Sequence, residues 1–234
     1  MKTQIYFVLG PTASGKSKFA LNLANKLNGE IINADSMQIY RELSILTARP
    51  TVNDQKKINH HLYGFVKGDV RFNVQKWCEE ASKKINYLVD KNINPILVGG
   101  TGLYIESLIN GIVSIPSIPE KVKIESEKMI LKIGKENFFN LVKELDSDAM
   151  INIAPNDIQR IRRIWEVNIF TKKKFSDWKK IKNKNFINLK NYKILLFLPD
   201  KKENYRRVDH RTHLMMEEGA IEEVKNLLKL NYNN

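Results

Sequence analysis

The chain contains a single cysteine, Cys78, and no long run of apolar residues. One cysteine excludes an internal disulfide framework and leaves too little sulfur for a structural zinc site. We expect Cys78 to be a half-buried helical thiol. The apolar run at 5–9 is too short for the core of a signal peptide, and no stretch approaches the roughly 20 apolar residues that span a bilayer. These absences predict a cytoplasmic protein.

Acidic residues are scarce relative to basic ones. The 234 residues include 39 lysines and arginines against 26 aspartates and glutamates, a formal net charge of +13 at pH 7. Such a molecule attracts polyanions before any specific contact forms, so nucleic acid, an acidic membrane surface and a phosphorylated substrate are the partner classes to weigh. It is equally possible, on composition alone, that the basic surface is simply solvated and binds none of these partners.

Apolar runs alternate with helical patterns in the first 111 residues. The pattern predicts strands at 4–10, 29–35 and 94–100 and helices at 18–27 and 73–91, the first with Phe19, Leu23 and Leu27 on one face. This alternation is typical of an α/β fold with a mostly parallel sheet flanked by helices. Ligands gather at the C-terminal ends of such strands, where Gly10, Asp35 and Gly99 fall.

The character of the sequence changes after residue 111. A turn-rich connector follows, and from 121 to about 184 the pattern is helical and charged, without convincing strands. A strand at 192–200 and helices at 206–230 then return to the sheet. We therefore expect a core domain at 1–111, a helical insertion at 112–189, and the rest of the core at 190–234.

Residues 10–17, GPTASGKS, match the P-loop pattern G-x-x-x-x-G-K-[ST], between an expected strand and an expected helix. Backbone amides from 13 to 16 and the helix N-terminus would face phosphate oxygens, Lys16 supplies a positive charge, and Ser17 can ligate Mg²⁺. The alternative is an ordinary glycine turn capped by serine. The eight residues of the motif are Gly10, Pro11, Thr12, Ala13, Ser14, Gly15, Lys16 and Ser17.

A P-loop indicates a bound diphosphate or triphosphate and not which bond is broken. In an NTPase or kinase, an apolar strand ending in a magnesium-binding aspartate is expected, but the strand at 94–100 ends in glycines and Thr101. This departure favours a chemistry in which diphosphate is the leaving group.

Ordered blocks follow the P-loop along the chain. They are DSMQIY at 35–40, TARPT at 47–51, HHLYGF at 60–65, LVGGTGLY at 97–104, NDIQRIRRIWEV at 156–167 and RRVDHRTHLMMEEGAIEEV at 206–224. In this order they resemble the signature blocks of the tRNA dimethylallyltransferases, also called tRNA isopentenyltransferases, over essentially the whole chain. The resemblance implies a P-loop fold, Mg²⁺, and a monomer that transfers a dimethylallyl group from dimethylallyl diphosphate to N6 of tRNA adenine 37, giving N6-dimethylallyladenosine and diphosphate.

The reaction needs a base and a set of donors for the leaving diphosphate. An exocyclic adenine amine is a poor nucleophile, so a carboxylate that takes its proton lowers the barrier. Asp35, at a strand end close to the P-loop, is our candidate, with a helix cap or a magnesium ligand as alternatives. Lys16, the P-loop amides and Thr101 can meet the charge that develops on diphosphate. The resemblance adds Arg207, which could equally be a solvated helix arginine.

The resemblance also implies contacts with the anticodon stem-loop of tRNA. Arg160 and Arg163 are three residues apart and would share a helix face, which suits a row of phosphates. Lysines and aromatics interleave at 172–190, a pattern that fits RNA binding or aromatic anchors for a solvated helix. The implied contact residues are Asp35, Ser36, Met37, Gln38, Thr101, Lys123, Gln159, Arg160, Ile161, Arg162 and Arg163. Adjacent histidines His60 and His61 have no partner ligands at metal-binding spacing, and we expect them to be structural or to line the substrate approach.

Two departures from the family pattern stand out. Leu46 occupies a position that is usually glycine, which predicts an altered loop after Asp35. Family members also normally continue for some tens of residues beyond the helix at 219–228, so we expect the chain to be truncated. Two other functions stay open: a P-loop kinase of a nucleotide or small metabolite, and an RNA-binding remnant without turnover.

Overall fold

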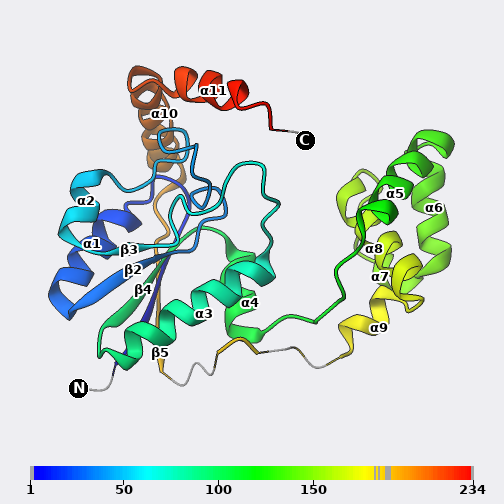
Figure 1. Ribbon diagram of the computed structural model, residues 1–234, viewed down its shortest axis with the longest axis horizontal. Coiled ribbons are helices and arrows are strands. Elements are labelled where there is room, and N and C mark those ends of the chain that lie inside the picture. Colours follow the sequence, from blue (N-terminus) through cyan, green and yellow to red (C-terminus); the bar gives the residue numbers. More distant parts are fainter. Residues whose placement is uncertain (1–2, 182, 184, 188–190, 233–234) are drawn as a thin grey trace. The chain divides into compact units, whose positions relative to one another are not determined.

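The computed structural model describes residues 3–181, 183, 185–187 and 191–232. The chain divides into two compact units, of which the first comprises Met1–Asn110 with Asn185–Asn234 and the second comprises Gly111–Lys184. Figure 1 shows the sheet in the first unit and a cluster of helices in the second. Among the described residues, no helix combines the length and apolar character needed to cross a bilayer.

The first unit is built on a five-stranded parallel sheet with the order β3-β2-β4-β1-β5. The strands are β1 (Ile5–Leu9), β2 (Gly29–Asn33), β3 (His60–His61), β4 (Asn94–Gly99) and β5 (Tyr192–Leu196). The predicted α/β fold with a parallel sheet is confirmed, and β5 returns to pair with β1. The edge strand β3 was not anticipated, because two residues carry no readable periodicity.

Helices cover both faces of this sheet at its central strands β2, β4 and β1, which place apolar side chains in the cores on either side. The helices of this unit are α1 (Lys16–Leu27), α2 (Val52–Lys57), α3 (Val74–Asp90), α4 (Gly102–Asn110), α10 (Lys201–Glu217) and α11 (Ala220–Lys229). On β1, Phe7 packs into a core with α3 and α4, whereas Val8 packs into a second core with α1. Helices α10 and α11 follow β5 in the chain. They lie beyond the C-terminal ends of the strands (Figure 1).

The buried face of α1 is centred on two alanines next to the expected residues, of which Leu23 packs against the same core. Ala20 and Ala24 are fully buried against the sheet, whereas Phe19 is 39% exposed and lies edge-on to Phe197 at 5.0 Å between ring centroids. Two alanines let the helix approach the strands closely, which turns Phe19 toward the rim of the core. Cys78 is fully buried within α3, and burial raises the pKa of its thiol to about 12, so the thiol is unreactive at neutral pH.

The second unit has its own apolar core, centred on Phe138, Ile161 and Trp165. Its helices are α5 (Glu120–Ile133), α6 (Lys135–Leu145), α7 (Ser147–Met150), α8 (Ile158–Thr171) and α9 (Phe175–Lys179). Asp146 ties α7 to α9, because its buried carboxylate accepts hydrogen bonds from the backbone amides of Ala149 at 3.2 Å and Ser176 at 3.0 Å. A separate core supports a unit that can fold around its own contacts.

Gly99 at the end of β4 is predicted to tolerate no side chain. A Cβ there would lie 2.0 Å from the backbone oxygen of Ala34, so Gly99→Ala must push the ends of β2 and β4 apart. We expect it to lower the free energy of unfolding by about 3 kcal/mol in urea titrations. Gly102→Ala, where an added Cβ meets nothing within 4 Å, is the control and should change it by less than about 0.5 kcal/mol. Equal effects of the two substitutions would contradict this view of the strand ends.

Candidate active site

The P-loop joins β1 to α1 as an exposed turn with two left-handed residues. Ala13 has a φ of 60° and Gly15 a φ of 87°, and Gly15 is the N-cap of α1. This winding turns successive amides in one direction, which is how such loops form an anion-binding concavity. The Lys16 ammonium donates to the backbone oxygen of Pro11 at 2.9 Å, so the lysine folds back over the loop.

A cavity of about 270 Å³ opens above this loop. Most of the predicted P-loop lines it, together with Asp35 and Gln38 from the segment after β2. The complete lining is Thr12, Ala13, Ser14, Gly15, Lys16, Ser17, Lys18, Asp35, Gln38, Thr47, Ala48, Val98, Gly99 and Arg211. The Ser14 hydroxyl is buried beside it without a hydrogen-bond partner among the described residues, which leaves a polar group available to a ligand.

The side chain of Asn33 at the end of β2 fixes the position of Asp35. Its amide donates to the backbone oxygens of Asp35 at 2.9 Å and Leu62 at 3.0 Å, and its side-chain oxygen accepts from the Asp35 amide at 2.8 Å. One Asp35 carboxylate oxygen accepts from the Met37 amide at 2.9 Å. The carboxylate is therefore held at the cavity wall with its second oxygen free of any such bond to the described residues.

Thr101, at the start of α4, joins the ends of β2 and β4. Its hydroxyl accepts from the Ser36 amide at 3.0 Å, and its own amide donates to the Ala34 oxygen at 3.3 Å. Thr101 therefore lies beside the segment that follows Asp35, although it does not line the cavity itself. The predicted group of Asp35, Ser36, Gln38 and Thr101 is brought together.

Arg211 on α10 supplies a second cation to the cavity, and the sequence pattern did not single it out. Burial lowers the pKa of Arg211, and the charge of Asp35 partly offsets this; burial likewise lowers the pKa of Lys16, which Asp35 opposes and Arg211 reinforces. The buried Nε of Arg211 has no partner among the described residues. Lys16 and Arg211 thus flank one carboxylate and leave positive charge for an anion.

Arg207, which the resemblance indicated, does not line the cavity, and its contacts fit the alternative of a solvated helix arginine. Its Nε donates to Glu203 at 3.0 Å, and its side chain is 48% exposed, as in an ordinary surface ion pair. Arg207 and Arg211 share one sequence block, RRVDHR, and the same helix face, so the block alone did not separate them. The signal that could have done so is Glu203, four residues before Arg207, a spacing at which helix ion pairs form.

A second cavity, of about 540 Å³, adjoins the first and shares Ala48 and Arg211 with it. Apolar side chains of Ile45, Val52 and Met215 form part of its wall. The site therefore offers a cationic phosphate cradle next to a less polar space, an arrangement suited to a ligand with a charged and an apolar part.

Comparison with known proteins identifies the family of this chain. A model of the IPP transferase family matches residues 38–234. The tRNA dimethylallyltransferase of Pelagibacter ubique is 45% identical over 230 residues, which cover 98% of this chain and 73% of that protein. The enzyme of the same name from Parvibaculum lavamentivorans is 41% identical, over 92% of this chain and 68% of that protein. The chain belongs to the IPP transferase family.

Solved structures of similar proteins share the fold. The tRNA delta(2)-isopentenylpyrophosphate transferase of Staphylococcus epidermidis is 28% identical, with a TM-score of 0.62 over 99% of this chain and 75% of that one. A eukaryotic dimethylallyltransferase acting on tRNA is 29% identical, with a TM-score of 0.79 over 98% of this chain and 56% of that one. The chain thus spans only part of the length of these two proteins.

The cavity wall offers oxygen atoms of the kind that hold Mg²⁺ together with phosphate groups. Ser17 offers a hydroxyl and Asp35 a carboxylate, both on the cavity wall. No cluster of three acidic, histidine or cysteine side chains that could hold a metal occurs among the described residues. Mg²⁺ is commonly held by one or two protein oxygens, water and substrate phosphates, so Ser17 fits this role without a protein cage.

The other predicted tRNA residues lie in the second unit of this family member. On α8, Gln159, Arg160 and Arg163 are exposed, whereas Ile161 is fully buried in the core, so its side chain is not available to RNA. Arg162 is half-buried and bonded to Glu127 at 2.8 Å. Lys123 pairs with Glu120 at 2.6 Å.

The adjacent histidines lie at the sheet edge away from the cavity lining. The His61 ring nitrogen bonds Glu30 at 2.6 Å, and His60 bonds the Ile58 oxygen at 2.8 Å. Burial lowers the pKa of both rings, and their hydrogen bonds oppose this. These contacts give the two histidines a structural role, because they fix the edge strand β3 that the histidines form.

Arg211 and Arg207 lead to opposite expectations for anion binding. We expect Arg211→Ala to weaken the binding of inorganic diphosphate with Mg²⁺ about tenfold, because the substitution removes a charge-assisted hydrogen bond in a partly buried site. Arg207→Ala should change it less than about twofold, as for an exposed ion pair. Isothermal titration calorimetry measures both. The reverse order of effects would return the role to Arg207.

Proposed function

We propose that this chain transfers the dimethylallyl group of dimethylallyl diphosphate to N6 of adenine 37 in tRNA, giving N6-dimethylallyladenosine and diphosphate. The observation that carries the proposal is that the P-loop with Lys16, Asp35 and Arg211 line one cavity together. A chain of the IPP transferase family with this constellation has a cradle for diphosphate and a carboxylate for an amine proton.

In the reaction, the bond between C1 of the allyl group and the bridging oxygen breaks as the bond from N6 to C1 forms. Negative charge grows on the leaving diphosphate and meets donors that are already in place: the P-loop amides, Lys16 and Arg211. The neighbouring cavity of about 540 Å³ provides room for the apolar part of the substrates. Mg²⁺ bound by Ser17 and phosphate oxygens would add positive charge at the diphosphate.

Asp35 is the base in this scheme. N6 becomes positively charged as it attacks and must lose a proton, and a carboxylate with one oxygen already bonded to the Met37 amide is oriented to accept it on the other. Thr101 holds the Ser36 amide and so keeps the segment after Asp35 in register with α4. We therefore assign Thr101 the support of the base, next to a flipped adenine.

The second unit is proposed to grip the anticodon stem. The exposed Gln159, Arg160 and Arg163 lie within one turn of α8, and the buried Ile161 anchors that turn in the core. Such a row suits contacts to phosphates, which position the RNA without reading its sequence. A monomeric state and a cytoplasmic location remain predictions.

A P-loop kinase accounts for the cradle but for fewer of the other features. β4 ends in Gly99 and is followed by Gly100 and Thr101, so the aspartate that would hold magnesium in a kinase is missing at this strand end. Phosphoryl transfer from ATP is the property that separates the two functions.

The decisive assay is the transfer of labelled dimethylallyl diphosphate to unmodified tRNA with adenine at positions 36 and 37. We expect the unmodified chain to label the tRNA and Asp35→Ala to lower kcat by about 10² to 10⁴-fold, because general-base assistance is removed. Diphosphate binding by Asp35→Ala, measured by calorimetry, is the control and should persist. If Asp35→Ala labels the tRNA with an undiminished kcat, Asp35 is not the base. If the chain transfers phosphate from ATP and does not label the tRNA, the proposed function is wrong.

The salt dependence of tRNA binding tests the role of α8. Removing one phosphate-binding side chain should reduce the slope of log K against log salt by about 1, so Arg160→Ala and Arg163→Ala should each flatten it. Arg162→Lys keeps the charge of a half-buried residue that pairs with Glu127 and should leave the slope unchanged. Filter binding of tRNA over a salt series measures this. Unchanged slopes for all three variants would place the RNA elsewhere.

A further inference from the structure

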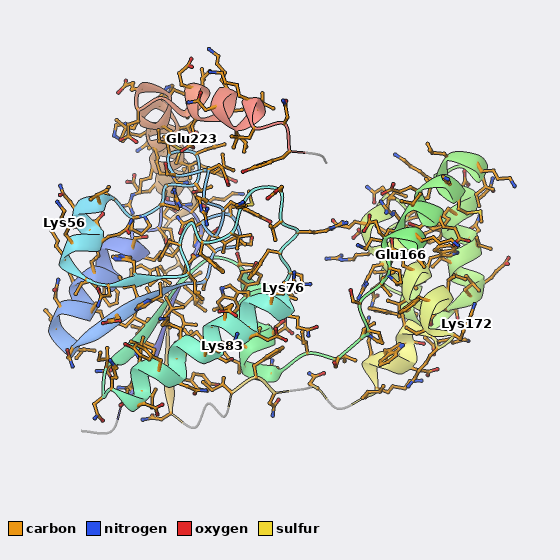
Figure 2. The ribbon with its side chains drawn as sticks, in the orientation of Figure 1. Lys56, Lys76, Lys83, Glu166, Lys172 and Glu223 are labelled. Carbon is orange, nitrogen blue, oxygen red and sulfur yellow. The ribbon has the colours of Figure 1, made fainter. Side chains whose placement is uncertain are left out.

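One carboxylate outside both cavities binds the loop that walls them. Glu223, in the first turn of α11, accepts hydrogen bonds from the Ser44 amide at 2.6 Å, the Ser44 hydroxyl at 2.7 Å and the Ile45 amide at 2.9 Å through one oxygen. Its other oxygen accepts from the Leu46 amide at 2.9 Å. Figure 2 shows Glu223 on α11, next to the loops at the end of the sheet.

These contacts favour the charged form of Glu223. Burial by itself would raise the pKa of this carboxyl, but the bonds from Leu46, Ile45 and Ser44 outweigh burial and hold the pKa below its ordinary value. Hydrogen bonds to a carboxylate are about twice as strong as those between neutral groups. Three of them come from the backbone amides of consecutive residues and fix the backbone of the loop, including that of Leu46.

Leu46, at the position where the family pattern has glycine, is accommodated without backbone strain. Its φ is not in the left-handed region, and its side chain is 44% exposed, so no glycine is needed for its backbone conformation. The left-handed residue of this loop is Ala48, with a φ of 51°. What holds position 46 is its amide, which donates to Glu223.

The inner side of the same loop holds Gln38. The Gln38 amide nitrogen donates to the backbone oxygens of Thr47 at 2.8 Å and Ala48 at 2.9 Å. The turn is closed by the Ala48 amide, which donates to the Ile45 oxygen at 2.9 Å. Gln38, Thr47 and Ala48 all line the cavity that contains Asp35. A continuous series of hydrogen bonds therefore runs from Glu223 through the loop to a side chain at the cavity.

We propose that Glu223 is a positioning residue for prenyl transfer: by holding the Ser44–Leu46 amides it sets the loop that orients Gln38 beside Asp35, where the target adenine must lie. This inference rests on the proposed function. Glu223 lines neither cavity, so it acts through the loop and not on a substrate. Helix α10 carries Arg211 and leads through Gly219 into α11, which carries Glu223. The same helix pair therefore places a cation in the cavity and holds the Ser44–Leu46 amides of its wall, a set of hydrogen bonds that we call the clamp.

The test combines exchange of backbone amides with steady-state kinetics in the full chain. Glu223→Gln removes the charge and one acceptor at almost constant size. Glu222→Gln is the matched control, because Glu222 is the preceding residue on α11 and pairs with Lys225 at the surface. Hydrogen–deuterium exchange of residues 44–48 should accelerate at least about tenfold in Glu223→Gln and stay unchanged in Glu222→Gln.

Steady-state kinetics test whether Glu223 affects prenyl transfer through Gln38. We expect Glu223→Gln to lower kcat/KM for tRNA about tenfold, with KM for dimethylallyl diphosphate within about twofold of the unmodified chain. In the Gln38→Ala background the same substitution should lower kcat/KM by less than about threefold, since residues in one network are not additive. Urea titrations of each variant confirm that it is folded.

Each outcome decides one part of the inference. Unchanged exchange at 44–48 in Glu223→Gln would overturn the clamp. Faster exchange with equal reductions of kcat/KM in both backgrounds would overturn positioning through Gln38 and leave Glu223 a purely structural residue. If the unmodified chain transfers no prenyl group, the proposed function fails by itself, while the exchange data still decide whether Glu223 holds the loop.

Discussion

The site depends on the close approach of β2 and β4 where these strands end. Gly99 lacks a side chain because the backbone oxygen of Ala34 occupies the space that a Cβ would need, at 2.0 Å. The Ala34 amide donates to the Val98 oxygen at 2.8 Å, and the Ala34 oxygen then accepts from the Thr101 amide at 3.3 Å. The two chain segments leave the sheet together, so Asp35 emerges next to the P-loop. Neighbouring parallel strands place their C-terminal ends on one edge, and here the edge becomes the reaction site.

The parts of this site that could be predicted are those whose functional residues are adjacent in the sequence. The P-loop needs a strand, a glycine turn and a helix in immediate succession, and all three are read from residues 4–27. Asp35 follows from the rule that a polar residue ending a buried strand lies at the ligand edge. The sheet was readable because β1, β2 and β4 are apolar on both faces, which the cores on either side explain.

The parts that escaped prediction depend on contacts between distant segments. Phe19 satisfies a helical apolar pattern as well as Ala20 does, and only the close packing of α1 on the sheet decides which is buried. Arg211 and Arg207 are alike in sequence, and the approach of α10 to the P-loop selects Arg211. Glu223 reads as one more acidic residue in the first turn of a helix, because its partners are 177 to 179 residues away. Periodicity and motif spacing do not indicate which residues come into contact when they are this far apart in the sequence.

The charges at the cavity explain why this P-loop suits the departure of diphosphate. Lys16 and Arg211 face a single carboxylate, Asp35, so the protein side of the cavity holds an excess positive charge that is partly removed from water. An anion that gains charge as its bond to carbon breaks is bound more strongly at that stage than before it, which is the differential binding that catalysis requires. In the proposed reaction the attacking amine becomes positive, and Asp35 is the group that we assign to meet that charge. Under this proposal, one cluster of three side chains would oppose both charges that develop, each with a group of the opposite sign.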